Sequence, residues 1–201
     1  MRHRPNSADG ANGYSLVEVL FVLGVTATLS GIAVPHILAA LDELRTQGAV
    51  RYMSSRLQRT RMQALVRSSN VAMRFTRDGS AVSYAIYADG NGNGVLARDI
   101  DRGVDREIQA SERLPDNFYG VEFGTLAGLP AADASSAPPG TDPIRLGSSD
   151  MVSFTALGTS TSGSLYIRGP RQTQYAIRVF GESGKTRLLR FDSHNWRWEP
   201  L

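Results

Sequence analysis

The segment 89–101 carries the densest group of potential metal-ligating residues in the chain. Its oxygen-bearing residues first alternate with glycine, as at the start of an EF-hand-type calcium loop, where alternate side chains face one cation. The twelfth position, which should be acidic, is Ile100. The sequence therefore supports two interpretations: a calcium site, or a Gly/Asn turn between strands that needs no metal. The ligands of such a site would be Asp89, Asn91, Asn93, Asp99 and Asp101.

Basic residues form two clusters. Residues 45–77 contain eight arginines and no acid, and residues 168–190 contain six basic residues and one acid, Glu182. Arginines gathered on one face neutralise phosphates, so DNA binding is one hypothesis. The alternative is a solvated face that pairs with the acidic stretch 89–107 or with a neighbouring molecule. The residues proposed to contact nucleic acid are Arg178, Lys185, Arg187 and Arg190.

Glu18 is the one formally charged residue between positions 14 and 41. The run 19–41 spans roughly 30–35 Å as a helix, which is enough to cross a bilayer core. A carboxylate near such a run is costly unless it reaches the headgroups or meets a cation. Cleavage after Gly13 would create that cation, because Tyr14 would then carry a free amine. Glu18 of one chain could pair with this amine on another.

The N-terminal residues resemble the type IV pilin and pseudopilin signature, a glycine followed by Phe-Thr-Leu-Ile-Glu-Leu at the start of a long apolar helix. This chain reads Gly13-Tyr14-Ser15-Leu16-Val17-Glu18-Val19. The resemblance implies cleavage by prepilin peptidase between Gly13 and Tyr14, N-methylation of Tyr14, and a role for Glu18 in subunit alignment. It also implies an inner-membrane protein with a cytoplasmic N-terminus, a periplasmic domain and other pilins or pseudopilins as partners. Pro35 lies where such helices commonly kink, and proline bends a helix in any case.

The C-terminal part resembles the GspH/FimT-like minor pseudopilins and pilins. Their late strand carries a Phe-x-x-x-Gly element, here Phe154 to Gly158, and their last strands surround a Gly-Arg-x-Arg motif, here Gly184-Lys185-Thr186-Arg187. A lysine replaces the first arginine. The resemblance implies a minor pseudopilin of a type II secretion system pseudopilus or type IV pilus, involved in protein secretion. Its alternative is a FimT-like pilus-tip protein that binds DNA for natural transformation.

The spacing of apolar residues predicts the elements that carry these motifs. Residues 42–69 keep the helical period, so the helix should run from Tyr14 to about Arg67, roughly 80 Å. Beyond Asn70 the period changes to two, which is typical of strands. The predicted strands are 71–77, 81–87, 118–123, 151–155, 163–168, 174–180 and 186–192.

These elements predict an α+β, pilin-like fold, in which a long, partly transmembrane N-terminal helix packs on an antiparallel sheet or sandwich. The expected parts are a leader at 1–13, a membrane and assembly half of the helix at 14–41, an amphipathic half at 42–69, and a periplasmic β-rich domain at 70–201. Segment 126–143 is rich in Ala, Gly, Ser and Pro, which predicts a flexible exposed loop.

The composition excludes further classes of function. The chain has 201 residues, 41% hydrophobic and 20% charged, and it contains no cysteine. Disulfides, thiolate nucleophiles and Cys-ligated metals are therefore excluded. The three histidines do not form a metal or catalytic motif, and no cofactor is expected apart from the calcium hypothesis. We therefore expect a structural subunit and no enzyme, and a membrane-anchored enzyme is the least favoured alternative.

Overall fold

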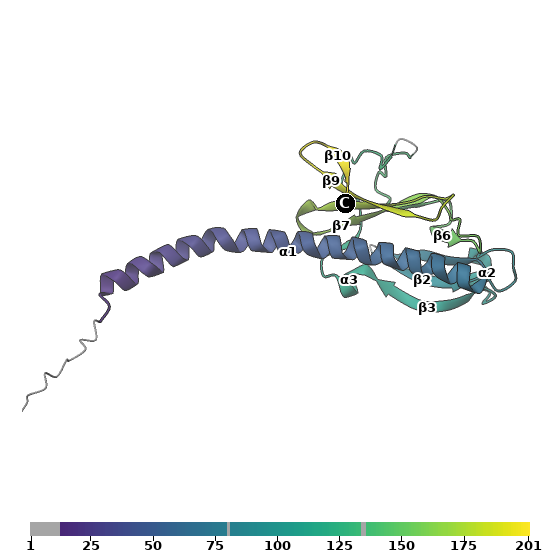
Figure 1. Cartoon of the computed structure of the whole chain (residues 1–201), viewed down its shortest axis with the longest axis horizontal. Helices are drawn as coiled ribbons and strands as arrows, with labels where there is room; N and C mark the ends of the chain where they lie inside the picture. The colour runs from purple at the N-terminus through teal and green to yellow at the C-terminus, as the bar shows by residue number, and fades with distance from the viewer. Residues whose placement is uncertain (1–12, 80, 134–135) are drawn as a thin grey trace, which may run out of the picture. The chain divides into compact units, whose positions relative to one another are not determined.

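The computed structural model describes residues 13–79, 81–133 and 136–201 (Figure 1). The predicted leader lies outside the described residues except for Gly13. The chain divides into two units, residues 1–40 and 41–201, and each is described by itself. Helix α1 (Leu16–Arg67) begins in the first unit and ends in the second.

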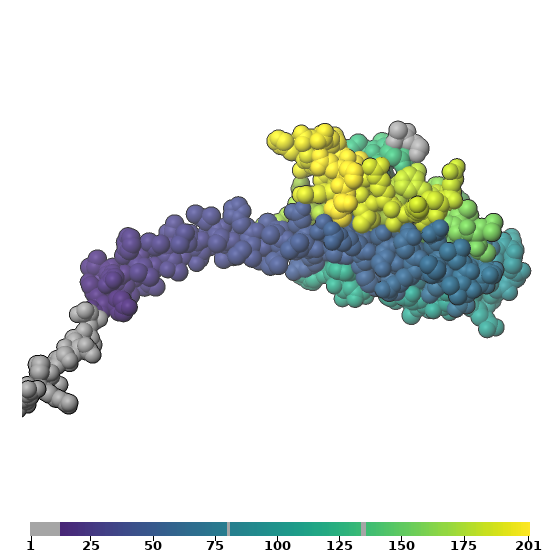
Figure 2. Space-filling model, viewed as in Figure 1, coloured from purple at the N-terminus to yellow at the C-terminus, as the bar shows by residue number. Residues whose placement is uncertain are grey.

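In the first unit every described side chain from residue 13 to 40 is exposed (Figure 2). The helix continues through Pro35, and its hydropathy and length are sufficient to cross a membrane. Two hydroxyls within the apolar run are satisfied locally: Thr26 donates to the carbonyl of Val22 at 2.7 Å, and Thr28 to that of Gly24 at 2.9 Å. This bonding removes the cost of placing a free hydroxyl in an apolar medium.

In the second unit the same helix buries one stripe. Its buried residues recur three or four positions apart, which places them on one face of the helix. Most are apolar, and the Thr60 hydroxyl donates to the carbonyl of Arg56 at 2.9 Å. The buried residues are Thr46, Ala49, Val50, Met53, Arg56, Leu57, Thr60 and Ala64.

Sheet A has four antiparallel strands in the order β3-β2-β1-β6. Its central hairpin pairs Asp78 with Ala81, and Gly79 has a φ of +59°, a conformation that glycine adopts without strain. A short helix, α2 (Ala97–Asp101), lies in the connection to β3. The strands are β1 (Val71–Asp78), β2 (Ala81–Ala88), β3 (Arg106–Arg113) and β6 (Met151–Phe154).

Sheet B contains the later strands in the order β10-β9-β8-β7-β4, and β5 pairs with β7. All of these pairings are antiparallel. The strands are β4 (Glu122–Phe123), β5 (Ile144–Leu146), β7 (Gly163–Arg168), β8 (Gln174–Val179), β9 (Thr186–Asp192) and β10 (Arg197–Pro200). Two short helical segments, α3 (Leu114–Asn117) and η1 (Pro170–Gln172), complete the unit.

The main core joins the buried stripe of α1 to one face of each sheet. Alternation assigns the faces of sheet B: Leu165 and Ile177 belong to this core, whereas Tyr166 and Ala176 belong to a second cluster on the opposite face. We call this opposite face the outer face of sheet B. The expected α+β architecture, a long helix packed on antiparallel sheets, is confirmed.

Glu112 on β3 ties the helix to sheet A. Its Oε1 accepts hydrogen bonds from Arg56 at 2.8 Å and Gln109 at 2.9 Å, and its Oε2 accepts from the hydroxyls of Tyr52 at 2.9 Å and Tyr84 at 3.0 Å. Burial, and next the Glu112 carboxylate, raise the pKa of Tyr84 well above its usual value, so this hydroxyl stays a donor.

Two sequence predictions are wrong in part. The strand predicted at 118–123 is reduced to β4, because Phe118 ends helix α3 and Gly120 turns the chain with a φ of +75°. The segment predicted as an exposed loop at 126–143 is partly anchored, since Leu129 and Ala132 are buried on the outer face of sheet B. The indole of Trp198 also donates to the carbonyl of Pro130 at 3.0 Å.

Candidate functional site

The predicted processing and assembly site lies at the start of α1. Ser15 caps the helix: its hydroxyl accepts the N–H of Val17 at 3.3 Å, and its carbonyl accepts the N–H of Val19 at 3.1 Å. The helix therefore starts two residues after Tyr14, which leaves the predicted Gly13–Tyr14 cleavage bond in non-helical backbone. Exposed, non-helical backbone is where proteases cut most readily.

Glu18 lies in the first turn of α1, where the partial positive charge of the helix N-terminus favours a carboxylate. Within the described residues its carboxylate has no hydrogen bond or ion pair. The flanking apolar side chains are exposed as well, including Leu16 at 76% and Phe21 at 71%. The site thus combines an unneutralised carboxylate with an uncovered apolar helix. The predicted kink at Pro35 stays a prediction.

The acidic loop, residues 89–105, is organised by hydrogen bonds within the protein. Partial burial alone would raise the pKa of Asp89, but hydrogen bonds from Asn70 and from the backbone N–H groups of Gly94, Gly92 and Asn91 together lower it. The three backbone bonds measure 2.7–3.1 Å. This carboxylate closes the turn in the manner of an Asx motif.

Two further acids complete the loop. Asp99, 5% exposed, accepts the side-chain amides of Asn91 at 3.4 Å and Asn93 at 3.1 Å. Asp105, 1% exposed, accepts the N–H groups of Gly90 at 3.0 Å and Leu96 at 2.9 Å. The sequence hypothesis did not include Asp105.

The structure brings together four of the five candidate calcium ligands. The fifth, Asp101, instead pairs with Arg74 at 2.9 Å. In this arrangement the two asparagines present their nitrogens, not their oxygens, to Asp99. No cluster of three His, Cys, Asp or Glu side chains suited to a metal occurs in residues 13–79, 81–133 and 136–201. The calcium site stays a hypothesis beside the turn that needs no metal.

The four basic residues proposed for DNA do not form one surface. Arg190 belongs to the helix-facing side of β9 and pairs with Glu43 of α1 at 2.7 Å. Arg178 and Arg187 are directly opposite each other on the outer face of sheet B, and Arg178 pairs with Asp133. Lys185 is exposed in the β8–β9 turn.

The glycines of the C-terminal motif contact the helix. Gly158, with a φ of +84°, accepts the Nε–H of Arg61 through its carbonyl at 3.0 Å. Gly184, with a φ of +61°, accepts the amide of Gln58 at 3.2 Å. A Cβ at Gly184 would lie 2.5 Å from the carbonyl oxygen of Gly158. These two glycines therefore help to hold α1 against the β-rich part of the chain, and Lys185 and Arg187 of the motif are exposed.

Sequence signals existed for some of the missed residues. Ser15-x-x-Glu18 has the spacing of a capping box, which predicts a helix start at this serine. Ile144-Arg145-Leu146 has the alternation of a strand with one outward side chain. Glu112 and Asp105 had no local signal, because their partners come from other elements.

Comparison with known proteins gave few matches. No family model matches the chain. The pilin-like protein PilA1 of Thermus thermophilus is 31% identical over 81 residues, which is 40% of this chain. The chain spans about half the length of this curated relative. The sequence similarity thus agrees with the resemblance to pilin-like proteins noted from the N-terminal motif.

Two solved structures of the minor pseudopilin EpsH from the type II secretion system of Vibrio cholerae also align with this chain. The first has a TM-score of 0.45 at 16% identity and covers 73% of this chain and 97% of the other. The second has a TM-score of 0.39 at 12% identity and covers 80% of this chain and 95% of the other.

Proposed function

We propose that the chain is a pilin-like structural subunit, a minor pseudopilin of the GspH/FimT type, that assembles with other pilins or pseudopilins into a membrane-anchored fibre. The observation that carries this proposal is the first unit: an exposed apolar helix, preceded by Gly13-Tyr14, in which the Glu18 carboxylate has no partner among the described residues. The sequence similarity to a pilin-like protein supports it.

In this proposal the apolar helix has two successive environments. Residues 14–41 first cross the inner membrane, with the basic leader in the cytoplasm and the β-rich domain in the periplasm. Prepilin peptidase then cuts after Gly13, Tyr14 is N-methylated, and the helix packs against those of neighbouring subunits. The Glu18 carboxylate pairs with the new amine of a neighbour, because an apolar assembly strongly favours neutralising both charges.

Processing can be tested by co-expressing the full chain with a prepilin peptidase and measuring the mass of the product. We expect loss of residues 1–13 from the wild-type chain and an uncut product for Gly13→Leu. Gly10→Leu is the matched control, since it changes a leader glycine away from the predicted bond. Normal cleavage of Gly13→Leu would contradict the proposal.

Assembly can be tested separately with Glu18→Gln, which removes the charge but keeps the size. We expect this variant to be cleaved normally and to lose co-purification with the other pilin-like subunits from membranes of the native host. Glu182→Gln changes an exposed acid in the second unit and should behave as wild type. Equal recovery of partners with Glu18→Gln would exclude the alignment role.

A second function in DNA capture finds less support in the structure. Two of the four residues proposed for it, Arg178 and Arg190, are already paired with carboxylates of the same chain, and these two lie on opposite faces of sheet B. We therefore propose assembly into a fibre for protein secretion, without nucleic acid as a partner.

A further inference from the structure

A row of basic residues crosses the outer face of sheet B. In register, Arg145 of β5 is opposite Ser164 of β7, Ser164 is opposite Arg178 of β8, and Arg178 is opposite Arg187 of β9. We call these four residues the arginine row. Neighbouring strands lie about 4.8 Å apart, so the row spans about 14 Å from its first to its last arginine.

The arginine row destabilises the chain when no other molecule is bound to it. Like charges directly opposite each other on one face of a sheet repel. Arg178, the central arginine, is compensated by Asp133. Arg145 and Arg187 are exposed, and no ion pair to either occurs within the described parts of the chain.

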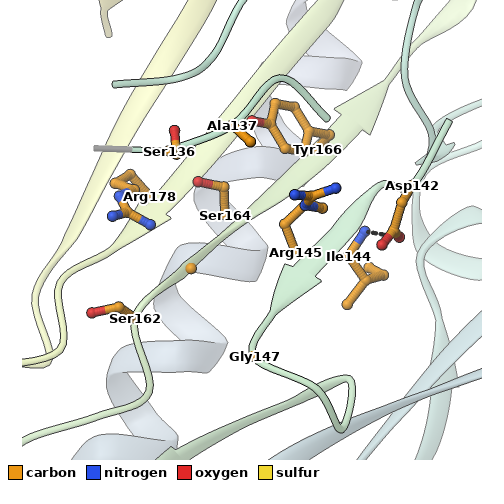
Figure 3. Close-up of a pocket in the computed structure, with 11 residues that line it drawn as sticks. Ser136, Ala137, Asp142, Ile144, Arg145, Gly147, Ser162, Ser164, Tyr166 and Arg178 are labelled. Atoms are coloured by element: carbon orange, nitrogen blue, oxygen red, sulfur yellow. Dashed lines mark hydrogen bonds between the residues drawn. The ribbon is translucent and has the colours of Figure 1, made fainter. Parts of the chain in front are cut away.

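Arg145 and Arg178 line a cleft of about 450 Å³, together with Ser162, Ser164 and Tyr166 (Figure 3). Figure 3 shows the side chains of Arg178, Ser164 and Arg145 next to one another along this surface. Asp142 also lines the cleft, but its carboxylate is bound by Arg77 at 2.7 Å and by the N–H of Ile144 at 3.0 Å. The cleft therefore presents an excess of donors.

The chain itself shows what kind of group this face accepts. The segment 126–133 lies on the outer face, buries Leu129 and Ala132 next to Tyr166, and gives the carboxylate of Asp133 to Arg178. A loop segment with an acidic side chain is thus already bound at the centre of the row. The two outer arginines offer the same chemistry to a peptide from another molecule.

We propose that the arginine row is a docking site for an acidic, extended segment of a partner protein, which neutralises Arg145 and Arg187. Guanidinium groups suit carboxylates because they can donate two parallel hydrogen bonds. An extended peptide advances about 3.3 Å per residue, so acids about four residues apart reach both arginines. The site is independent of the assembly helix and of the Glu18 role.

The test uses the full chain in detergent micelles and a hexaglutamate peptide, which spans about 20 Å when extended. Binding is measured by fluorescence anisotropy of the labelled peptide, with hexaglutamine as the neutral control. We expect hexaglutamate to bind, with an affinity that falls about tenfold in the double variant Arg145→Ala/Arg187→Ala. The matched control is Arg51→Ala/Arg59→Ala, which removes two exposed arginines of α1 and should change little.

Thermal unfolding without peptide separates binding from folding. The double variant Arg145→Ala/Arg187→Ala should melt at the wild-type temperature or above it, because like-charge repulsion is relieved. A lower melting temperature would assign these arginines a structural role and overturn the proposal.

Absence of hexaglutamate binding, or an equal loss of affinity in both double variants, would also overturn it. A single-stranded oligothymidylate tests the competing class of ligand. If the oligonucleotide bound through Arg145 and Arg187 and hexaglutamate did not, the row would be a nucleic-acid site and the present proposal wrong. Glu18→Gln should bind hexaglutamate as wild type does, which keeps this test separate from assembly.

Discussion

The two halves of helix α1 have opposite relations to the rest of the chain. From Leu16 to residue 40 every side chain is exposed, whereas between Thr46 and Ala64 eight side chains are buried by the same chain. One continuous helix is thus left uncovered by its own chain at one end and packed by it at the other. The predictions below test this contrast, from the largest expected effect to the smallest.

Truncating equivalent leucines in the two halves should give very different results. Leu57 is fully buried in the main core, so Leu57→Ala should lower the free energy of unfolding of the second unit by about 2–5 kcal/mol. Leu23→Ala, in the exposed half, should leave it unchanged. Both tryptophans lie in the second unit, so urea unfolding followed by tryptophan fluorescence isolates this unit. An equal loss of stability in Leu57→Ala and Leu23→Ala would contradict the contrast between the two halves of α1.

The second-largest effect is expected at Gly184, which contacts the packed half of α1. Gly184→Ala should destabilise the second unit by about 2–3 kcal/mol, because the residue has a positive φ and its new Cβ would clash with the Gly158 carbonyl. Gly79→Ala is the control: its φ of +59° is similar but the space around it is open, so about 1 kcal/mol is expected. If the two costs were equal, the contact between these glycines would be unimportant.

The Glu112 hydrogen bonds make a smaller contribution. Glu112→Gln keeps the shape but places an amide N–H₂ where a carboxylate oxygen accepts two donors. We expect a loss of about 1–3 kcal/mol in urea unfolding, since buried donors are left unpaired. Glu107→Gln, an exposed acid on the same strand, should change the free energy by less than about 0.5 kcal/mol. If Glu112→Gln left the free energy of unfolding unchanged, apolar packing alone would hold the helix to sheet A.

Acid should weaken the 89–105 loop through Asp89. Its pKa is lower in the folded protein than in the unfolded chain, so its stabilising contribution is complete above the unfolded pKa of about 4. That contribution disappears as the pH falls through the folded pKa. Asp89→Asn should therefore be less stable than wild type at pH 7, and the difference should shrink below pH 4. A constant difference across this range would contradict the assigned role.

The smallest expected effect concerns external ligands of the second unit. Because the acids of the 89–105 loop already accept protein N–H groups, calcium should leave the melting temperature unchanged relative to a chelator. A rise with calcium would show that the asparagine amides turn their oxygens toward a cation. The second unit would then depend partly on a group from outside the chain.

Local sequence patterns predicted most of the elements but few of the contacts. The period change after Asn70 and the apolar alternation predicted β1, β2, β6, β7, β8 and β9 close to their bounds. β3 was not predicted, because its sequence, REIQASER, is that of a polar edge strand whose residues are mostly exposed or half-buried. Alternation cannot identify a strand that buries neither face well.

The functional residues also divide into those that a local motif predicts and those that only the fold brings together. Gly13, Tyr14 and Glu18 form a local motif and could be proposed from the sequence, although their roles stay predictions. The arginine row depends on the register of four strands, so Arg145 could not be grouped with Arg187 before the sheet was known. Arg190 shows the converse, since it is three residues from Arg187 in sequence but on the other face of the strand.

The contacts that hold the helix also constrain the order of folding. Ser54 bonds Thr186 at 2.8 Å and Gln58 bonds Gly184, across more than 120 residues of sequence. The helix is synthesised first, yet its packing surface is completed only when the final hairpin has been made. Contacts this distant in sequence form slowly. The side of the helix that carries Ser54 and Gln58 therefore lacks these partners until β9 has been synthesised, and a chain truncated before β9 would never acquire them.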